Sequence, residues 1–565
     1  MEIYTLTAPD YTIIFIYLLL MVLVGGGIGL FVRNINDYFT GSGSVPWHLG
    51  AVSNYMTMVS TFMFVAHAGI AYEYGLVALL ILWSPIPPTL FATFYFGKRW
   101  KRAGLVSPVE FLETRYNFSV RQLISWGGIL FRLIENMVRL YAAGLFIATT
   151  TSLSMTHAIM LCGGIVIIYT MIGGIWSVVL TDTIQCVILV LTTSIMIPLT
   201  LSAIGGVTPF FEKYPDHLHW NNGPKGHWLF LSVYYIIVTI KYCGNWSFAQ
   251  RFYSMKDERS IHAMGLLAAF LYFVFPFIFL FPAITAPMLL PNLDNPERVY
   301  IEMCLKLLPP GLMGLMISAM FAACMSTLSA EYNITAGVLI KDVYQRLFRS
   351  NAGSRELIIV ARLMTAFIGM FIIGGALFVE HFGGAFEVNK LVTGLFGVPL
   401  VVPVVFGLIW KRPRPAGAVV CVLGGVVTGI VLNLLPMINW ETATLIQTLF
   451  CIGIFFVSSY IPSTSGTKET AYQERIETFF QQLATPYKAP EETSEQQIRR
   501  GGMMLLFSIS LGVCGFLFFL ASLFSIGQPG SRLAFYIGIL CILCSFFLLK
   551  IKLFPKNNHV KPKNT

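Results

Sequence analysis

Charged residues are scarce in this sequence. Of its 565 residues, 11% are charged and 56% are hydrophobic, and the mean hydropathy is +0.73. A soluble chain of this length would divide into several domains and need far more charged surface. Apolar runs of about twenty residues recur instead, long enough to cross a hydrocarbon core. The composition excludes a soluble enzyme and predicts an all-α integral membrane protein, because helices satisfy their own backbone in lipid.

Three further absences narrow the class of protein. The ten cysteines lack metal-ligand spacing and a disulfide framework. No cleavable leader is predicted, because Glu2 and Asp10 stand where a basic segment would be and the first apolar run is too long. No nucleophile–base arrangement appears. The net charge of +10 lies in short loops between apolar runs, which indicates a membrane orientation signal and no nucleic-acid partner.

The apolar runs predict about fifteen spanning helices, at residues 11–32, 47–73, 76–97, 122–151, 155–175, 180–204, 228–248, 263–290, 311–340, 358–380, 388–410, 415–436, 440–461, 502–524 and 533–554. Basic residues follow the third, ninth and eleventh of them, for example Arg102, Arg346 and Lys411. This pattern predicts a plasma-membrane protein with its N-terminus outside and its C-terminus in the cytoplasm. The polar segment 463–500 has an amphipathic patch near 476–483 and is interpreted as a cytoplasmic linker with a short helix.

Hydroxyl-rich patches inside two apolar runs are candidate ion sites. Residues 49–75 hold Ser53, Asn54, Thr57, Ser60 and Thr61, which either join helices or mark an unwound segment whose carbonyls bind an ion. In residues 318–342, the adjacent hydroxyls of Ser326 and Thr327 offer the hard oxygen ligands that small cations prefer. Between these patches, the pair Gly173-Gly174 predicts the end of one helix, and Asp182 is interpreted as the N-cap of the next.

Five charged residues fall within apolar runs: Arg132, Glu135, Arg139, Lys241 and Lys390. Glu135 lies three residues after Arg132 and four before Arg139, so it can pair with either. The two lysines have no acidic residue four positions away. They require a distant carboxylate, a water-filled cavity or an anionic ligand. Two interpretations therefore stay open, a structural pair with Glu135 or Glu73 and a site for an anionic solute.

Several spaced motifs resemble the sodium:solute symporter family. They are Tyr169-Thr170 with Gly173-Gly174, Thr181-Asp182 and Gln185, then the loop 107–116, Gln250-Arg251, and 325–329 leading to Asp342 and Tyr344. The resemblance covers about residues 8–460. It implies a LeuT-like core of two inverted repeats of five helices, here 47–204 and 228–410, each opening with a discontinuous helix. Flanking units are then 1–46, 411–462, the linker 463–500 and a C-terminal pair of helices with a basic tail, 501–565.

The resemblance also implies a sodium site. Its ligands would be the backbone carbonyls of Met56, Val59 and Ala323 and the hydroxyls of Ser326 and Thr327. Some members bind a second sodium, which here implies Asp182, Ser326 and Ser329, although the serine expected next is Ala330. Sodium is the only cofactor implied.

The implied solute site departs from that of the sugar carriers. Positions polar in those carriers are Met63 and Leu82 here, and an aromatic residue and a glutamine are replaced by Lys241 and Lys390. The remaining predicted solute-site residues are Ser60, Glu135, Arg139, Tyr242 and Asn245. Two added cations favour sodium-driven symport of a small organic anion, such as a carboxylate or acidic sugar. One alternative is sodium-driven symport of a neutral sugar or polyol. Another is a membrane sensor or an uncoupled channel, and the short tail after Phe554 argues against the sensor.

Overall fold

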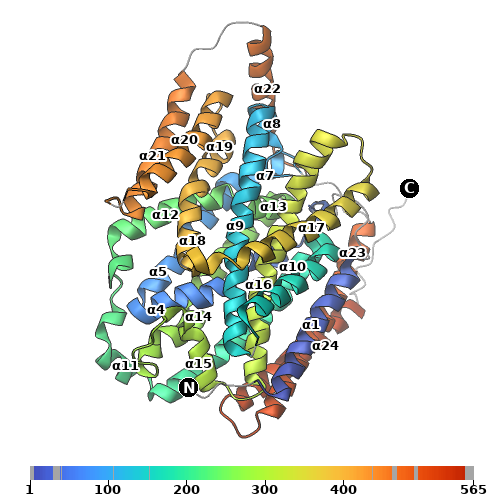
Figure 1. Cartoon of the computed structure of the whole chain (residues 1–565). Coiled ribbons are helices and arrows are strands. Elements are labelled where there is room, and N and C mark those ends of the chain that lie inside the picture. The colour runs from blue at the N-terminus through green and yellow to red at the C-terminus, as the bar shows by residue number, and fades with distance from the viewer. Residues whose placement is uncertain are drawn as a thin grey trace, which may run out of the picture.

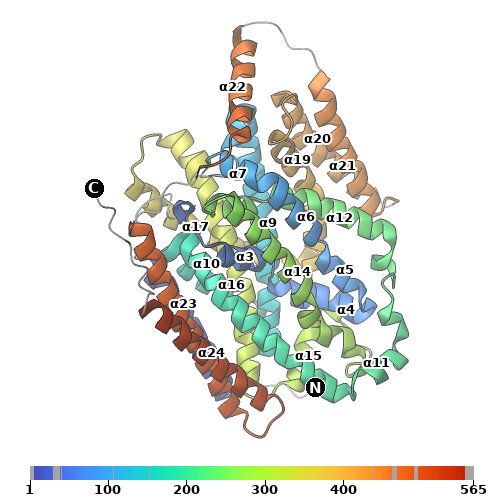
Figure 2. The ribbon, with the colours of Figure 1, turned by 180° about the vertical axis from the view of Figure 1, so that it is seen from behind.

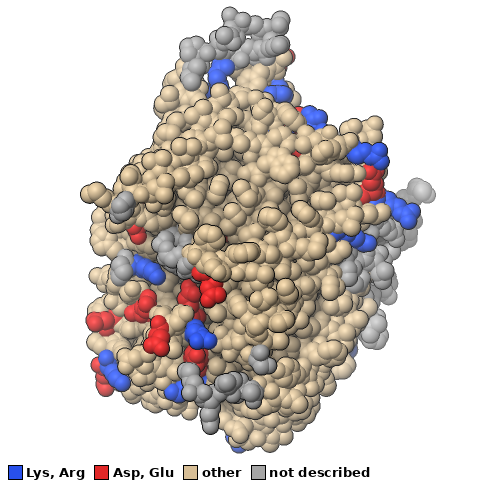
Figure 3. Space-filling view, viewed as in Figure 1, with Lys and Arg blue, Asp and Glu red and all other residues tan. Residues whose placement is uncertain are grey.

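The computed structural model describes residues 6–29, 39, 41–105, 107–151, 153–382, 384–435, 437–460, 467–488 and 494–553. In these ranges the chain is helical, and its one β-bridge joins Val45 to Met255. Nine of the described helices are long and apolar enough to span a membrane, and four shorter apolar helices accompany them. Charged side chains gather at the lower left and along the upper right edge of one face, leaving a broad uncharged middle (Figure 3).

The first half of the chain contains ten α-helices within the described residues. Its elements are α1 (Ala8–Gly29), α3 (Trp47–Met56), α4 (Ala68–Tyr74), α5 (Val77–Trp83), α6 (Ile86–Phe91), α7 (Lys98–Arg102), α8 (Phe111–Arg115), α9 (Phe118–Thr150), α10 (Met155–Ile204) and α11 (Val207–Lys213).

The second half contributes the rest of the bundle (Figures 1 and 2). Its elements are α12 (Trp228–Cys243), α13 (Trp246–Ser254), α14 (Glu258–Thr285), α15 (Val299–Leu307), α16 (Leu312–Val338), α17 (Ser354–Ala376), α18 (Gly384–Val392), α19 (Val398–Gly407), α20 (Pro415–Asn433), α21 (Trp440–Val457), α22 (Thr467–Ala484), α23 (Ser494–Phe524) and α24 (Ser531–Leu553). The pair α23 and α24 packs beside α1, at one side of the molecule in both views.

Helix α10 corrects one expectation from the sequence. The glycine pair at 173–174 does not end a helix, because the backbone remains helical over all 50 residues from Met155 to Ile204. At 1.5 Å per residue this helix would be about 75 Å long, more than twice the thickness of a hydrocarbon core. Of its two apolar stretches, Ile175–Ile204 is long enough to span a membrane, and Met155–Ile168 is a shorter apolar stretch. Asp182 therefore lies inside α10, and its interpretation as an N-cap is wrong.

Helix α16 forms the centre of the bundle. Every one of its 27 residues is buried, and it packs against α1, α9, α10 and α17. Its first turn is held by Asp10 of α1, whose Oδ1 accepts hydrogen bonds from the backbone amides of Gly311 (2.8 Å) and Gly314 (2.7 Å). A buried carboxylate at a helix N-terminus satisfies amides that have no partner in the helix. The N-terminal helix thereby fixes the position of α16.

The linker between the bundle and its last two helices carries a docked helix, α22. Ile476, Phe479 and Leu483 of α22 are buried, and the Phe479 ring stacks on Phe111 of α8 with centroids 6.0 Å apart. Arg102 of α7 donates from Nη1 to the carbonyls of Leu483 (3.0 Å) and Ala484 (3.1 Å), which satisfies two acceptors at the end of α22. Helix α22 is thus held on the short helices α7 and α8 at one end of the bundle (Figure 1).

Candidate functional site

Two of the helices expected from the sequence, 47–73 and 228–248, are interrupted. Helix α3 ends at Met56, and the backbone is not helical again until Thr61. Helix α12 ends at Cys243, and α13 starts at Trp246 after Gly244 and Asn245. The Asn245 side chain caps α13 by accepting hydrogen bonds from the amides of Ser247 (2.8 Å) and Phe248 (3.2 Å). Breaks of this kind leave backbone carbonyls and amides available to ligands inside a membrane protein.

The first break faces the hydroxyl of Thr327 on α16. Thr327 Oγ1 lies 2.8 Å from the carbonyl oxygen of Val59, 3.4 Å from that of Met56 and 3.3 Å from that of Ala323. Four of the five predicted sodium ligands therefore converge on one point. The fifth, Ser326, turns its hydroxyl to Asp182 Oδ1 at 2.6 Å. A set of carbonyl and hydroxyl oxygens has the chemistry that a small hard cation requires.

Asp182 lies one helix away from this point and is fully buried. Its Oδ2 accepts a hydrogen bond from Ser53 (2.5 Å), and Arg251 Nη2 lies 3.8 Å from the same oxygen. Of the residues predicted for a second sodium, the structure joins Asp182 to Ser326, whereas Ser329 donates to the backbone oxygen of Ser326 (3.0 Å). The charge of Asp182 is already balanced by a guanidinium here.

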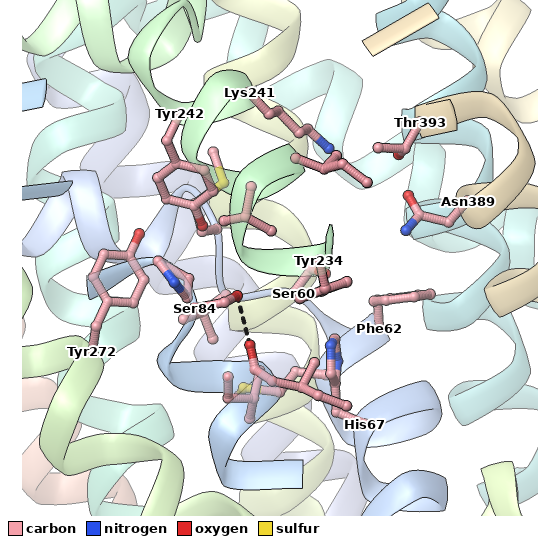
Figure 4. Close-up of a pocket in the computed structure, with 18 of the residues that line it drawn as sticks. Ser60, Phe62, His67, Ser84, Tyr234, Lys241, Tyr242, Tyr272, Asn389 and Thr393 are labelled. Atoms are coloured by element: carbon pink, nitrogen blue, oxygen red, sulfur yellow. Dashed lines mark hydrogen bonds between the residues drawn. The ribbon is translucent and has the colours of Figure 1, made fainter. Parts of the chain in front are cut away.

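A cavity of about 1330 Å³, including its open mouth, lies beside the two breaks. Seven of the nine predicted solute-site residues line it: Ser60, Met63, Leu82, Glu135, Arg139, Lys241 and Tyr242. Figure 4 shows Lys241 and Tyr242 on one side of the cavity and His67 and Phe62 on another. Asn245 borders a smaller neighbouring cavity and caps α13. Lys390 belongs to α18, and its side chain lies outside the described part of the structure.

Glu135 of α9 joins the charges of this cavity. It forms an ion pair with Lys241 of α12 and a second one with Arg139, whose Nη2 lies 3.2 Å from Glu135 Oε1. Arg139 also donates to Asn136 Oδ1 (3.0 Å). Lys241 therefore has a carboxylate partner in this structure, as one of the two interpretations from the sequence required. Two cations nevertheless share this one carboxylate.

A second buried ion pair was not predicted. Arg132 of α9 pairs with Glu331 of α16, and the side chains are 7% and 1% exposed. Glu331 Oε1 also accepts a hydrogen bond from Ser247 (2.7 Å), and the Arg132 guanidinium lies 4.8 Å from the ring centroid of Trp246. The pair thus holds the first two residues of α13 against α9 and α16. A glutamate inside a long apolar segment is the signal that could have found it.

Comparisons with known proteins agree with the motifs. The sequence model of the sodium:solute symporter family matches residues 38–425. A sodium/glucose cotransporter of Vibrio parahaemolyticus is 25% identical over 485 residues, covering 77% of this chain and 88% of that one. A sodium/pantothenate symporter of Haemophilus influenzae is 27% identical over 321 residues, covering 55% and 66%.

A solved structure shares the fold. The substrate-bound, outward-open state of a Na⁺-coupled sialic acid symporter superposes with a TM-score of 0.71 at 22% identity, covering 82% of this chain and 99% of that one. The resemblance inferred from the motifs is therefore confirmed, and the protein is a membrane transporter rather than an enzyme, with sodium as its coupling ion. This chain belongs to the sodium:solute symporter family.

Proposed function

We propose that this protein couples sodium entry to the symport of a small organic anion, such as a carboxylate or an acidic sugar. One observation carries the proposal: the cavity beside the helix breaks is lined by two cations, Arg139 and Lys241, and by a single carboxylate, Glu135. Within the described lining these are the only formally charged side chains. An excess cation in a membrane interior is costly unless an anion joins it.

The proposed coupling depends on the oxygen cluster around Thr327. Sodium held between the Met56, Val59 and Ala323 carbonyls and the hydroxyls of Ser326 and Thr327 would join the broken helix α3 to the central helix α16. That link favours a conformation in which the solute cavity is formed, so sodium and solute raise each other's affinity. Residues 47–204 and 228–410 are proposed as the inverted repeats whose relative motion exposes the site alternately on the two sides.

Purified protein should bind organic acids only in sodium, and Lys241→Met should weaken that binding. Loss of one charge-assisted contact of about 2 kcal/mol corresponds to roughly 30-fold in affinity. Glu135 keeps Arg139 as a partner in this variant, so the fold should survive. Thermal-shift titrations with carboxylates, acidic sugars and neutral sugars, in sodium and then in potassium, measure the effect.

Lys306→Met serves as the matched control. Lys306 is exposed, does not line the cavity and donates a hydrogen bond to the backbone oxygen of Leu289 (2.6 Å). It should leave every titration unchanged. Sodium-dependent binding of neutral sugars alone, insensitive to Lys241→Met, would instead assign the sugar or polyol alternative. Binding that is equal in sodium and potassium would contradict the proposed coupling.

A further inference from the structure

The buried ion pair between Arg132 and Glu331 lies close to both candidate sites. Glu331 follows Thr327 by four residues on α16, so the two side chains project from the same face of the helix, about one turn apart. Thr327 carries the hydroxyl that contacts the Val59 carbonyl in the candidate sodium site. A buried charge thus stands one helical turn from the proposed ion ligands.

The arginine of the pair lies beside the charged cluster of the solute site. Arg132 precedes Glu135 by three residues on α9, which again places two side chains on one face of a helix. Both line the smaller neighbouring cavity, which shares Glu135 and Lys241 with the solute cavity. Glu135 is the carboxylate with which Lys241 and Arg139 both pair. The ion pair therefore links the oxygen cluster on α16, through neighbouring turns, to the charges of the solute cavity.

The pair also holds the start of α13, which directly follows the second helix break. Ser247 donates a hydrogen bond to Glu331 Oε1 (2.7 Å), and the Arg132 guanidinium lies over the ring of Trp246. Lys241, on the other side of that break, is held to α9 by its own ion pair. Charged groups on α9 and α16 thus fix both segments that flank the break.

Packing of α9 on α16 does not by itself account for the pair. Apolar side chains of similar volume are often as stabilising as a buried ion pair, and ionisable groups inside membrane segments are costly. A second ion pair, Arg121 with Asp342, already joins α9 to the helical continuation of α16 (Nε to Oδ1 2.7 Å). Each of its members lies eleven residues from its counterpart in the first pair, and neither lines the two cavities. Arg132 and Glu331, in contrast, reach the second break.

We propose that Arg132 and Glu331 transmit the mutual effect of sodium and solute between the two sites. This inference rests on the proposed sodium-coupled symport. Occupation of the oxygen cluster at Thr327 fixes α16 against α3; Glu331, one turn away, then holds α13, and Arg132 places α9 with its Glu135 carboxylate for the solute. Arg132 and Glu331 line no part of the solute cavity, so both are positioning residues. Contiguous networks of salt bridges and hydrogen bonds can carry such a coupling free energy.

The test measures the factor by which sodium raises solute affinity, the dissociation constant in potassium divided by that in sodium, on the purified full-length protein. The probe is the tightest binder among lactate, benzoate, gluconate, glucose and myo-inositol. Ser247→Ala removes the hydrogen bond to Glu331 but keeps the ion pair. It should lower the factor by about tenfold, the effect of one hydrogen bond to a charged group. The double variant Arg132→Met with Glu331→Leu should bring the factor close to one.

Arg121→Met with Asp342→Leu is the matched control, because it removes an ion pair between the same two helices and leaves both cavities intact. Glu113, the other partner of Arg121, keeps Arg346 in this variant. The sodium factor of the control should equal that of the unaltered protein, and a fall as large as that of the double variant would overturn the inference.

Two further results would overturn the inference. One is an unchanged factor in Ser247→Ala or in the double variant. The other is an equal loss of affinity in sodium and in potassium, which would indicate a merely structural role. If only glucose or myo-inositol binds in sodium, the anion proposal fails and the factor for that probe still tests the pair. If none of the five probes binds in sodium, the proposed symport and the present inference fail together.

Discussion

Glu331→Leu should destabilise the protein by about 3–5 kcal/mol, because it leaves the buried Arg132 without its carboxylate. The same change removes the acceptor of the Ser247 hydroxyl and loosens the start of α13. The free energy of unfolding of the purified protein, or its unfolding temperature in detergent, measures the effect. An unchanged stability would show that Arg132 finds another partner when Glu331 is absent.

The double variant Arg132→Met with Glu331→Leu distinguishes the cost of one unpaired buried charge from the effect of losing the whole ion pair. Neither charge is then buried, and apolar side chains of similar volume fill the space, so most of the lost stability should return. A double variant that is less stable than Glu331→Leu would mean that Arg132 contributes chiefly through its packing on Trp246. The surface pair between Lys411 and Glu477 of α22 provides a control of the same charge type, and Glu477→Leu should cost less than about 1 kcal/mol.

Thr327→Val should abolish sodium-driven uptake at ordinary sodium concentrations. Valine keeps the shape of threonine but removes the hydroxyl that contacts the carbonyl oxygen of Val59. Loss of one ligand to a cation is expected to cost about 2 kcal/mol, roughly 30-fold in sodium affinity. Sodium titrations of solute binding and of uptake into vesicles measure the shift.

Thr335→Val is the matched control on the same helix. Thr335 is buried two turns further along α16, and its hydroxyl has no hydrogen-bond partner within the described residues. This variant should keep the sodium dependence of the unaltered protein. A Thr327→Val protein with an unchanged sodium titration would exclude the oxygen cluster as the coupling site, whatever its effect on maximal uptake.

The candidate sodium site could be proposed from the sequence because of the family resemblance. The sequence shows a pair of adjacent hydroxyls in one apolar segment and a polar, interrupted helix in another. Matching these segments to the family implied Met56, Val59 and Thr327 as ligands, and the structure brings these three residues together. The carbonyl ligands leave no trace in residue type, so the resemblance rather than the composition located them.

The rest of the site depends on packing that the sequence does not show. Glu135 was equally able to pair with Arg132 along α9, but Arg132 reaches across to Glu331 instead. Asp182 was interpreted as a helix cap because glycines precede it, whereas α10 continues past it and buries it between Ser53 and Ser326.

The contact between Asp10 and α16 has a consequence for biosynthesis. Synthesis begins at the N-terminus, so α1 enters the membrane long before Gly311, which lies 301 residues later. During that interval the Asp10 carboxylate lacks the Gly311 and Gly314 amides and keeps the nearby Thr7 amide and hydroxyl. A nascent chain that stops short of Gly311 should therefore hold α1 loosely. The earliest helix to be made reaches its final position among the last, once α16 supplies the two amides.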